Sequence, residues 1–307
     1  MPDLKNNRPV NTKTPKVSIG MPVYNGEKFI CKALDSLLCQ TFSDFELIIS
    51  DNASTDTTEA ICREYATHDS RIRYVRQKKN QGPLANFQYV LDDAVGEYFM
   101  WAAADDYWDE EFIDVLLSVS SAYQCLAYGF VQPLNAEGQN MIHPANQRKF
   151  DFRGSRFIRR LKYYLAPGFL GKANLIYGIF PSKILKTDGL SSLQSNIEGA
   201  DMLLMYEYLN QIEIRHAGTV FQYKRIHDGC YGMTTRDSNQ GAIERVAQFI
   251  KLLVKGPMLG QYIMKSSVIE SVFLLMAYPV CMARIAAVKI LFYYKNKRRN
   301  SCLLSKT

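Results

Sequence analysis

Several signatures of common protein classes are missing from this chain of 307 residues. Its seven cysteines stand at positions 31, 39, 62, 125, 230, 281 and 302, and no pair has the spacing of a zinc site or a redox motif. No Gly-x-Gly-x-x-Gly follows the first expected strand, which disfavours a Rossmann oxidoreductase. Residues 1–15 lack the apolar core of a signal peptide. We therefore expect reduced cysteines in a cytoplasmic protein and a disordered lead-in over residues 1–15.

Acidic residues are almost absent from the C-terminal part of the chain. The net charge is +7, and all of it lies from Pro257 onward, where Glu270 is the single acid, so that residues 1–256 are neutral in sum. A nucleic-acid-binding protein would carry its positive charge along its working face, so we expect no nucleic-acid partner. A neutral body with a basic, apolar tail instead indicates contact with an anionic membrane surface.

A long uncharged segment is also lacking. The longest one in the tail, Ser271–Ala283, has thirteen residues and contains Pro279, and the basic cluster Lys295–Arg299 follows it. A membrane-spanning helix needs about 20 apolar residues, so we expect this tail to lie at the membrane surface without crossing it. The alternative is a helical pair that packs on the body of the protein.

The chain up to residue 115 alternates between short apolar runs and segments with helical periodicity. We expect strands at 17–24, 45–50, 72–75 and 95–102, with helices at 29–38, 55–65 and 84–94 between them. This alternation predicts an α/β fold with a mostly parallel twisted sheet and helices on both faces.

The alternation weakens beyond residue 115. We expect further strands at 127–132, 175–180 and 219–225, and helices at 155–165, 200–209, 242–253 and 266–294. The expected organisation is a domain at 16–235, with halves at 16–115 and 116–235, and a helical C-terminal appendage at 236–307.

Polar side chains follow three of the expected strands, namely Asn25, Asp51 and the pair Asp105–Asp106. The carboxyl ends of parallel strands meet at one edge of a sheet, where open α/β sheets bind ligands. Carboxylate oxygens there suit Mg²⁺ or Mn²⁺ carrying a phosphate. The alternative is that the acids from Asp106 to Asp109 only cap the next helix.

An ordered set of segments resembles the family 2 glycosyltransferases, which are inverting enzymes with a GT-A fold. The resemblance is strong over residues 16–115 and looser to about residue 235. The segments, in order, are VSIGMPVYN at 17–25, SLLCQT at 36–41, FELIISDNASTD at 45–56, NQG at 80–82, Asn86, GEY at 96–98 and ADD at 104–106.

This resemblance implies a nucleotide site and a metal site at the edge of the sheet. Pro22, Tyr24 and Asn25 would line the pocket for the nucleotide base, and Asp51 would accept a hydrogen bond from that base. The alternative is that Asp51 only stabilises an Asx-turn. Asp105 would bind nucleotide phosphate through Mg²⁺ or Mn²⁺, with Asp106 beside it. The family's acid motif is usually Asp-x-Asp-Asp, and here Ala103 takes its first position.

The resemblance also implies a general base for the reaction and a second residue at the metal site. Asp201, in Glu198-Gly199-Ala200-Asp201, stands where the family has its general base, and a helix N-cap is the alternative role. Arg225 and His227 match a late Arg-x-His segment. His227 would complete the metal site and Arg225 would contact the diphosphate, although a lone histidine is commonly an ordinary surface or core residue.

The function that follows from the resemblance is transfer of a sugar from a nucleoside diphosphate donor, a UDP-sugar in particular, to an acceptor hydroxyl. The acceptor would be a saccharide or a lipid-linked molecule in cell-surface polysaccharide or glycolipid synthesis, and the enzyme would be peripheral at the inner face of the membrane. The alternative, favoured by Ala103, is a catalytically impaired relative that binds a sugar nucleotide or a partner. Retention of Asp51, Asp105, Asp106, Asp201 and His227 favours the enzyme.

Overall fold

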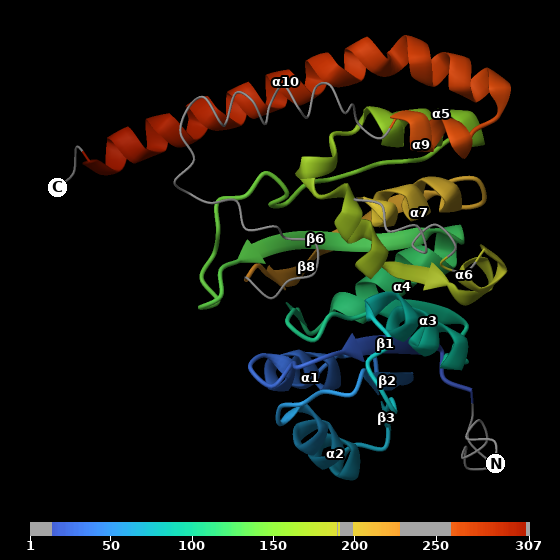
Figure 1. Ribbon diagram of the computed structural model, residues 1–307, viewed down its shortest axis with the longest axis vertical. Coiled ribbons are helices and arrows are strands. Elements are labelled where there is room, and N and C mark those ends of the chain that lie inside the picture. Colours follow the sequence, from blue (N-terminus) through green and yellow to red (C-terminus); the bar gives the residue numbers. More distant parts are fainter. Residues whose placement is uncertain (1–13, 189, 191–198, 228–258, 305–307) are drawn as a thin grey trace.

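The computed structural model describes residues 14–188, 190, 199–227 and 259–304, and for 187–188 and 293–304 it describes the backbone alone. Its centre is one eight-stranded sheet (Figure 1) with the order β3-β2-β1-β4-β7-β6-β8-β5. The strands are β1 (Val17–Val23), β2 (Phe45–Asp51), β3 (Ile72–Arg76), β4 (Tyr98–Trp101), β5 (Tyr107–Trp108), β6 (Leu126–Leu134), β7 (Ile179–Pro181) and β8 (Ile214–Arg225).

The sheet is mostly parallel, as the alternation of strands and helices predicts. Strands β3, β2, β1 and β4 run parallel to one another, and β6 runs parallel to β8. Strand β7 is antiparallel to both of its neighbours, and the short strand β5 closes the edge antiparallel to β8. The parallel strands therefore bring the ends of β1, β2 and β4 to one edge of the sheet.

Helices cover both faces of this sheet. They are α1 (Ile30–Leu38), α2 (Thr58–His68), α3 (Pro83–Asp93), α4 (Phe112–Tyr123), α5 (Arg156–Leu165), α6 (Ser182–Asp188), α7 (Ala200–Tyr208), α9 (Leu259–Met264) and α10 (Val268–Leu304), with 3₁₀ turns η1 (Gly168–Leu170) and η2 (Lys172–Tyr177).

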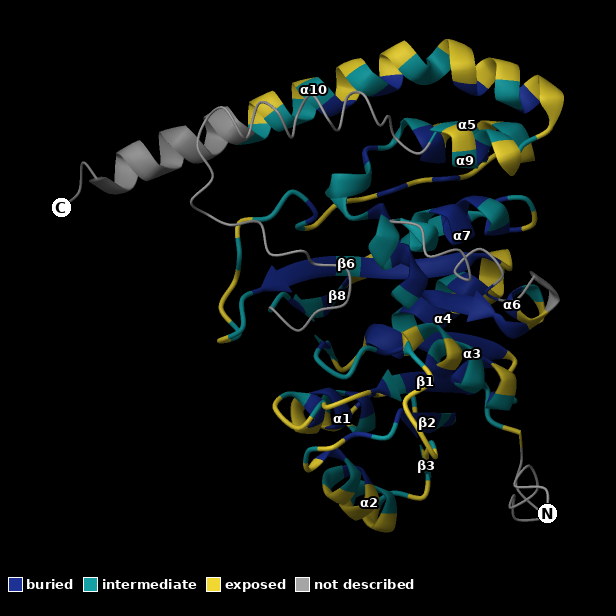
Figure 2. Cartoon of the chain, in the orientation of Figure 1, coloured by how far each residue is buried: buried dark blue, intermediate teal, exposed yellow. Residues whose placement is uncertain are grey.

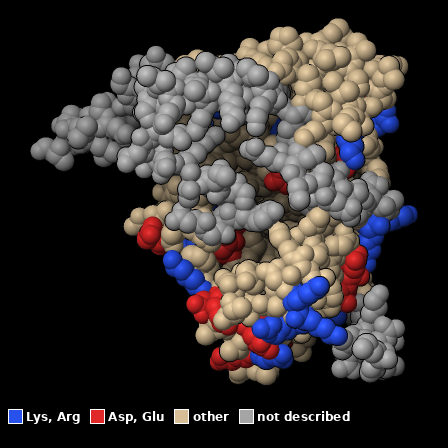
Figure 3. All heavy atoms as spheres, viewed as in Figure 1, with Lys and Arg blue, Asp and Glu red and all other residues tan. Residues whose placement is uncertain are grey.

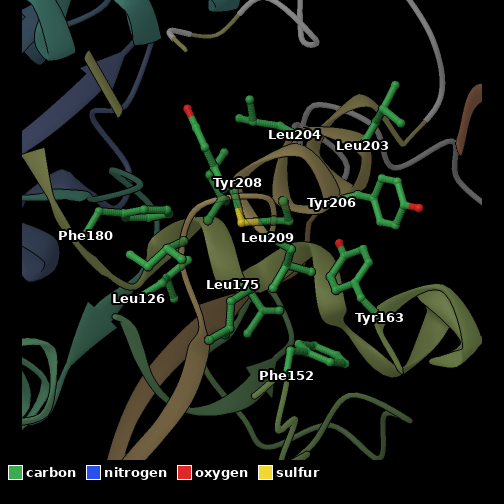
Figure 4. Packing of buried hydrophobic residues seen from close by; sticks show 14 of the residues in the cluster. Leu126, Phe152, Tyr163, Leu175, Phe180, Leu203, Leu204, Tyr206, Tyr208 and Leu209 are labelled. Atoms are coloured by element: carbon green, nitrogen blue, oxygen red, sulfur yellow. The ribbon is translucent and has the colours of Figure 1, made fainter. Parts of the chain in front are cut away.

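Each face has its own apolar core. One core joins α1 and α4 to the sheet through residues such as Leu34 and Leu116. The other joins α3, α5 and α7 to the opposite face, and Figure 4 shows part of it around Phe180 and Tyr208. Helix α3 lies so close to β1 that a side chain on Gly20 would meet Val90 at 2.7 Å, which explains the glycine in an otherwise apolar strand.

Two expectations from the sequence differ from the structure, and others lie outside it. The segment 175–180 is not one strand, because residues 172–177 form η2, and only Ile179–Pro181 pairs with the sheet. Gly178 separates the two, and a side chain there would meet the carbonyl oxygen of Ala127 at 2.4 Å. The second difference is the length of the helix in the tail, α10, which is longer than the uncharged run in the sequence suggests. The helix expected at 242–253, most of the lead-in at 1–15, Glu198 and the side chains of the basic cluster Lys295–Arg299 lie outside the described residues.

The tail forms the long helix α10, which packs across α5 (Figure 1). Glu270, Leu274, Cys281 and Ile285 are buried on one side of it. The prediction that the tail is too short to cross a membrane is wrong on length, since Val268–Phe292 is a 25-residue helix long and apolar enough to do so. The longest uncharged run underestimates this length because an apolar helix tolerates isolated charges such as Arg284 and Lys289.

Candidate active site

The acid turn between β4 and β5 is tied to the distant strand β8. Asp106 is 2% exposed, and its two carboxylate oxygens accept hydrogen bonds from the Gln222 side chain at 2.7 Å and the Arg225 backbone N–H at 2.9 Å. Burial, together with the negative charge of Asp105, raises the pKa of Asp106 to about 7. Asp106 thus holds the turn in place and leaves Asp105 less buried at the rim.

Asp105 lies against His227, which follows β8. The Oδ2 atom of Asp105 and the Nε2 atom of His227 are 3.0 Å apart, and the imidazole ring packs beside Phe29 of the β1–α1 loop at 4.9 Å. Within the described ranges, no cluster of three or more His, Cys, Asp and Glu side chains has the arrangement of a metal site. Among the described residues, Asp105 and His227 are thus the two side chains at this turn that could hold a metal ion.

The chemistry of this pair fits such an ion. Asp105 and His227 form a hydrogen-bonded pair at the rim of the sheet, and their carboxylate and imidazole are both groups that could hold a divalent cation there. A carboxylate with an imidazole suits Mn²⁺ as well as or better than Mg²⁺, which prefers oxygen ligands.

Arg225 is occupied by the protein itself. Its guanidinium donates to the carbonyl oxygens of Ala136 at 2.9 Å and Asp105 at 3.3 Å, and it lies 4.5 Å from the centre of the Phe29 ring. The side chain therefore braces the acid turn, and its predicted contact with a diphosphate stays a prediction.

The predicted nucleotide residues lie at the ends of β1 and β2. Pro22 is half-buried within β1, and Tyr24 directly after the strand is 49% exposed. Asn25 has a left-handed backbone with φ of 52°, and its side-chain oxygen accepts a hydrogen bond from the Thr55 N–H at 2.8 Å. This contact ties the loop after β1 to the loop after β2.

Asp51 is fully buried at the end of β2. Its carboxylate accepts hydrogen bonds from the Ser54 N–H and the Tyr74 hydroxyl, both at 2.8 Å. The first bond is the kind of turn contact that the alternative role for Asp51 describes. Its role toward a nucleotide base stays a prediction.

A polar hollow of about 250 Å³ lies between this strand end and α3. It is lined mainly by amide side chains, which are Asn52, Gln77, Gln81, Asn86 and Gln88, with Ala85, Tyr89 and Asp92. The Asn52 and Asn86 amides donate to backbone carbonyl oxygens of Gly82 and Ser50 respectively, so this lining fixes the loops around the end of β2.

Asp201 lies in the first turn of α7. Gly199, with φ of 84°, precedes the helix in a conformation that favours glycine. The Asp201 carboxylate accepts a hydrogen bond from the Met202 N–H at 2.7 Å and remains half-buried. The N-cap position of α7 is therefore Gly199, and Asp201 lies within the first turn as a half-buried carboxylate.

Tyr177, the last residue of η2, lies against Lys224 of β8. Burial raises the pKa of its phenol to about 12; the positive charge of Lys224 opposes that rise, and the negative charges of Asp106, Asp105 and Asp201 add to it. The Lys224 ammonium lies 4.7 Å from the centre of the Tyr177 ring.

Three residues of this site escape the sequence analysis, namely Gln222, Lys224 and Tyr177. Gln222 and Lys224 are two residues apart on β8, so strand alternation would place them on one face. Tyr177 offers no such signal because it lies in a 3₁₀ turn where the sequence predicts a strand.

Comparison with known proteins agrees with the expected family. The model of the family described as "Glycosyl transferase family 2" matches residues 18–176, which is about half of the chain. "Glycosyltransferase GlyA" of Streptococcus pneumoniae is 32% identical over 130 residues, covering 42% of this chain and 18% of that protein. "GalNAc(5)-diNAcBac-PP-undecaprenol beta-1,3-glucosyltransferase" of Campylobacter jejuni is 37% identical over 93 residues, covering 30% and 34%. The chain thus spans about a third or less of either relative.

Solved structures share the whole fold. Residues 1–349 of TarS from S. aureus superpose with a TM-score of 0.56 at 18% identity, covering 93% of this chain and 92% of that one. A second crystal structure of the same segment, in complex with UDP-GlcNAc, has a TM-score of 0.56 at 17% identity and covers 89% and 83%. The predicted GT-A architecture is therefore confirmed.

Proposed function

Because this chain belongs to glycosyl transferase family 2, we propose that it transfers a sugar from a nucleoside diphosphate donor to an acceptor hydroxyl with inversion at the anomeric carbon. The observation that carries this proposal is the contact between Asp105, which follows β4, and His227, which follows β8, at the edge of the sheet where the predicted nucleotide residues end β1 and β2. Such a transfer needs a diphosphate-binding group and a base flanking one reacting carbon.

The donor lies across the ends of β1, β2 and β4. Pro22, Tyr24 and Asn25 wall its base, and Asp51 accepts a hydrogen bond from the base in addition to those it already receives. The TarS segment was solved with UDP-GlcNAc and with UDP, which favours a UDP-sugar as the first donor to test.

Asp105 and His227 hold a divalent cation, Mn²⁺ or Mg²⁺, at the donor's diphosphate. The contact between their side chains supports this assignment. When bound, the cation stabilises the negative charge of the departing nucleoside diphosphate. Asp106 orients the turn through Gln222 and the Arg225 backbone, and its predicted place beside the metal stays a prediction.

Asp201 is the general base. The acceptor oxygen forms a bond to the anomeric carbon as the bond from that carbon to the diphosphate oxygen breaks, and the acceptor proton passes to the Asp201 carboxylate. The new bond forms on the face opposite the leaving group, so the configuration inverts.

The acceptor and the location of the enzyme follow from the tail. We place the protein at the cytoplasmic face of a membrane in the synthesis of a cell-surface polysaccharide or glycolipid. The Campylobacter relative is named for an undecaprenol-linked acceptor, which supports a lipid-linked acceptor over a free saccharide.

Helix α10 has an apolar outer side that suits a membrane surface. Its exposed stripe, the side away from the body, includes Val268, Ile269, Val272, Leu275, Met276, Val280, Ile290 and Leu291, which are 50–83% exposed. Figure 2 shows this exposed side along the described part of α10, and Figure 3 shows the same region, at the upper right, with few charged side chains. The opposite side is buried against the body, so crossing a membrane would require α10 to leave it, and we propose that the helix lies on the membrane.

The second candidate is a relative that binds a sugar nucleotide without transferring the sugar, favoured by Ala103 in the acid motif. The experiment is a screen of nucleotide sugars, starting with UDP-GlcNAc and Mn²⁺, that compares wild type with Asp201→Asn. We expect Asp201→Asn to bind the donor normally and to turn over about 10²–10⁴-fold more slowly. Wild-type turnover in this variant contradicts the assignment of the base, and binding without turnover in the wild type favours the second candidate.

A further inference from the structure

Helix α7 carries the proposed base at its first turn and contacts the tail at its last turn. We infer that α9 and the start of α10 position α7, and through it Asp201, so that the tail is part of the catalytic apparatus. This inference rests on the proposed function, since it concerns the residue proposed as the base.

The first observation is a set of direct contacts between the end of α7 and the tail. The Tyr206 hydroxyl and the Ser266 Oγ atom are 2.8 Å apart, and the Ser266 hydroxyl also donates to the Tyr262 carbonyl oxygen at 2.7 Å. The Tyr206 and Tyr262 rings meet edge to face with centroids 4.6 Å apart. Lys265 and Glu207 add an ion pair of 2.5 Å.

The two tyrosine rings of this set lie inside the protein. Tyr206 and Tyr262 are 1% and 2% exposed. Buried hydroxyl and ring contacts fix geometry better than exposed ones, because alternative partners are excluded. The end of α7 therefore has one packed arrangement, and the tail supplies part of it.

The second observation is the anchor of the tail itself. Arg160 of α5 pairs with Glu270 of α10 at 2.7 Å, and both side chains are almost completely buried. Glu270 also accepts a hydrogen bond from the Ser267 N–H at 2.9 Å, which closes a capping box at the start of α10. The Arg160 guanidinium lies 4.0 Å from the centre of the Tyr206 ring, so one buried cation contacts α10 and α7 together.

The third observation concerns the other end of α7. The Tyr163 hydroxyl of α5 donates to the Met202 carbonyl oxygen at 3.0 Å, and the Met202 N–H donates to the Asp201 carboxylate. Figure 4 shows Tyr163 and Tyr206 extending from α5 and α7. A helix of nine residues is only about 13 Å long and moves as a rigid unit, so a shift at Tyr206 displaces Asp201.

The donor residues have no part in this arrangement. Asp51, Asp105 and Tyr24 belong to the ends of β1, β2 and β4, whereas Tyr206, Ser266 and Arg160 belong to α7, the tail and α5. Loosening the tail contacts should therefore impair the chemical step and leave donor binding unchanged, a split that a purely structural role would not produce.

The test uses full-length Tyr206→Phe, Ser266→Ala and the double variant, with Tyr65→Phe as the matched control. The Tyr65 hydroxyl bonds Asp35 at 2.7 Å, far from α7 in the fold. Release of UDP from the best donor of the screen gives kcat, and UDP affinity with Mn²⁺ reports the donor site. We expect each variant to lower kcat about two- to tenfold, the worth of one hydrogen bond, with donor KM and UDP affinity unchanged.

The double variant should lower kcat no further than either single variant does, because both substitutions remove the same hydrogen bond between Tyr206 and Ser266. Folded Tyr206→Phe with wild-type kcat would overturn the inference. If the tyrosine variants fail to fold, Lys265→Met serves instead, with the same split expected and wild-type kcat again overturning it. Asp201→Asn in the same assay separates the two claims. Full turnover there refutes the proposed base, whereas an inactive Asp201→Asn beside a fully active Tyr206→Phe refutes only the role of the tail.

Discussion

The Oδ2 atom of Asp105 lies 3.0 Å from the Nε2 atom of His227, although 122 residues separate them along the chain. The contact exists because Asp106 next to it bonds the backbone of Arg225, which aligns the acid turn with the end of β8. The proposed metal site is therefore a product of two strand ends far apart in sequence.

Asp105→Asn should abolish metal-dependent donor binding. The amide keeps the size of the carboxylate but not its charge, and loss of several kcal/mol of stabilisation should weaken UDP affinity in Mn²⁺ by roughly 100-fold. Calorimetric titration of UDP with and without Mn²⁺ measures this. The control is Glu110→Gln, the same charge change at an exposed position nearby, which should bind as wild type. Equal affinity with and without Mn²⁺ in the wild type would contradict the prediction.

Glu270→Gln should destabilise the protein strongly. It leaves Arg160 buried without its anion, and breaking a buried pair in this way costs about 3–5 kcal/mol. The matched control is Asp151→Asn, which breaks an ion pair with Arg153 whose side chains are both half-exposed, and it should destabilise the protein far less because solvent screens this pair. Urea unfolding gives the free energy of unfolding of both variants. A similar decrease in the two would mean that the Arg160–Glu270 pair does not anchor the tail.

Lys172 should make the stability of the protein depend on pH. Its ammonium is buried and donates to the Tyr163 carbonyl oxygen, and burial lowers its pKa from 10.5 to about 7. Between pH 7 and 10.5 the unfolded chain holds a proton that the folded protein releases, so the free energy of unfolding should rise with pH across this window, by up to about 1.4 kcal/mol per pH unit.

Lys172→Met removes this contribution and should flatten the rise, whereas the exposed Lys78→Met should retain it. Urea midpoints at pH 7 and pH 9 for the three proteins provide the measurement. If the free energy of unfolding rises equally with pH in Lys172→Met, groups other than Lys172 cause the rise.

The exposed stripe of α10 should bind anionic membranes. Replacing Leu275 and Met276 together with glutamine removes apolar area at the centre of the stripe, and each such side chain contributes about 1.5–3 kcal/mol when buried. Sedimentation with phosphatidylglycerol vesicles should show binding at least tenfold weaker. Ile142→Gln, which makes the same kind of change on an exposed loop of the body, is the control. Wild-type binding by the α10 variant would exclude this face.

The sequence predicts the first half of the fold well because the information there is local. Strands such as β1 and β2 are largely apolar, β1 ends just before Asn25 and β2 ends at Asp51, and the turns between elements are short. The acid pair at 105–106 follows the same logic, since it comes soon after the apolar strand β4.

Contacts between side chains far apart in the sequence could not be predicted from such local patterns. The bond between Asp106 and Gln222 joins residues 116 apart, and neither residue carries a local signal for the other. The same holds for Arg160 and Glu270, which are 110 residues apart. Glu270 reads as an isolated acid in a basic tail, and only packing shows that it anchors α10 to the body. Residues 175–177 depart from the strand expected at 175–180 because they complete the 3₁₀ turn η2, which follows Gly171 with its φ of 91°.

The measurement that tests the central claim most directly is pulsed electron paramagnetic resonance of Mn²⁺ bound to the wild-type protein with UDP. Our account predicts modulation from a directly coordinated nitrogen, the Nε2 atom of His227, and its loss in His227→Gln under conditions where Mn²⁺ and UDP still bind. A wild-type spectrum without nitrogen coupling, or one that is unchanged in His227→Gln, would contradict the assignment of Asp105 and His227 as the metal-binding pair.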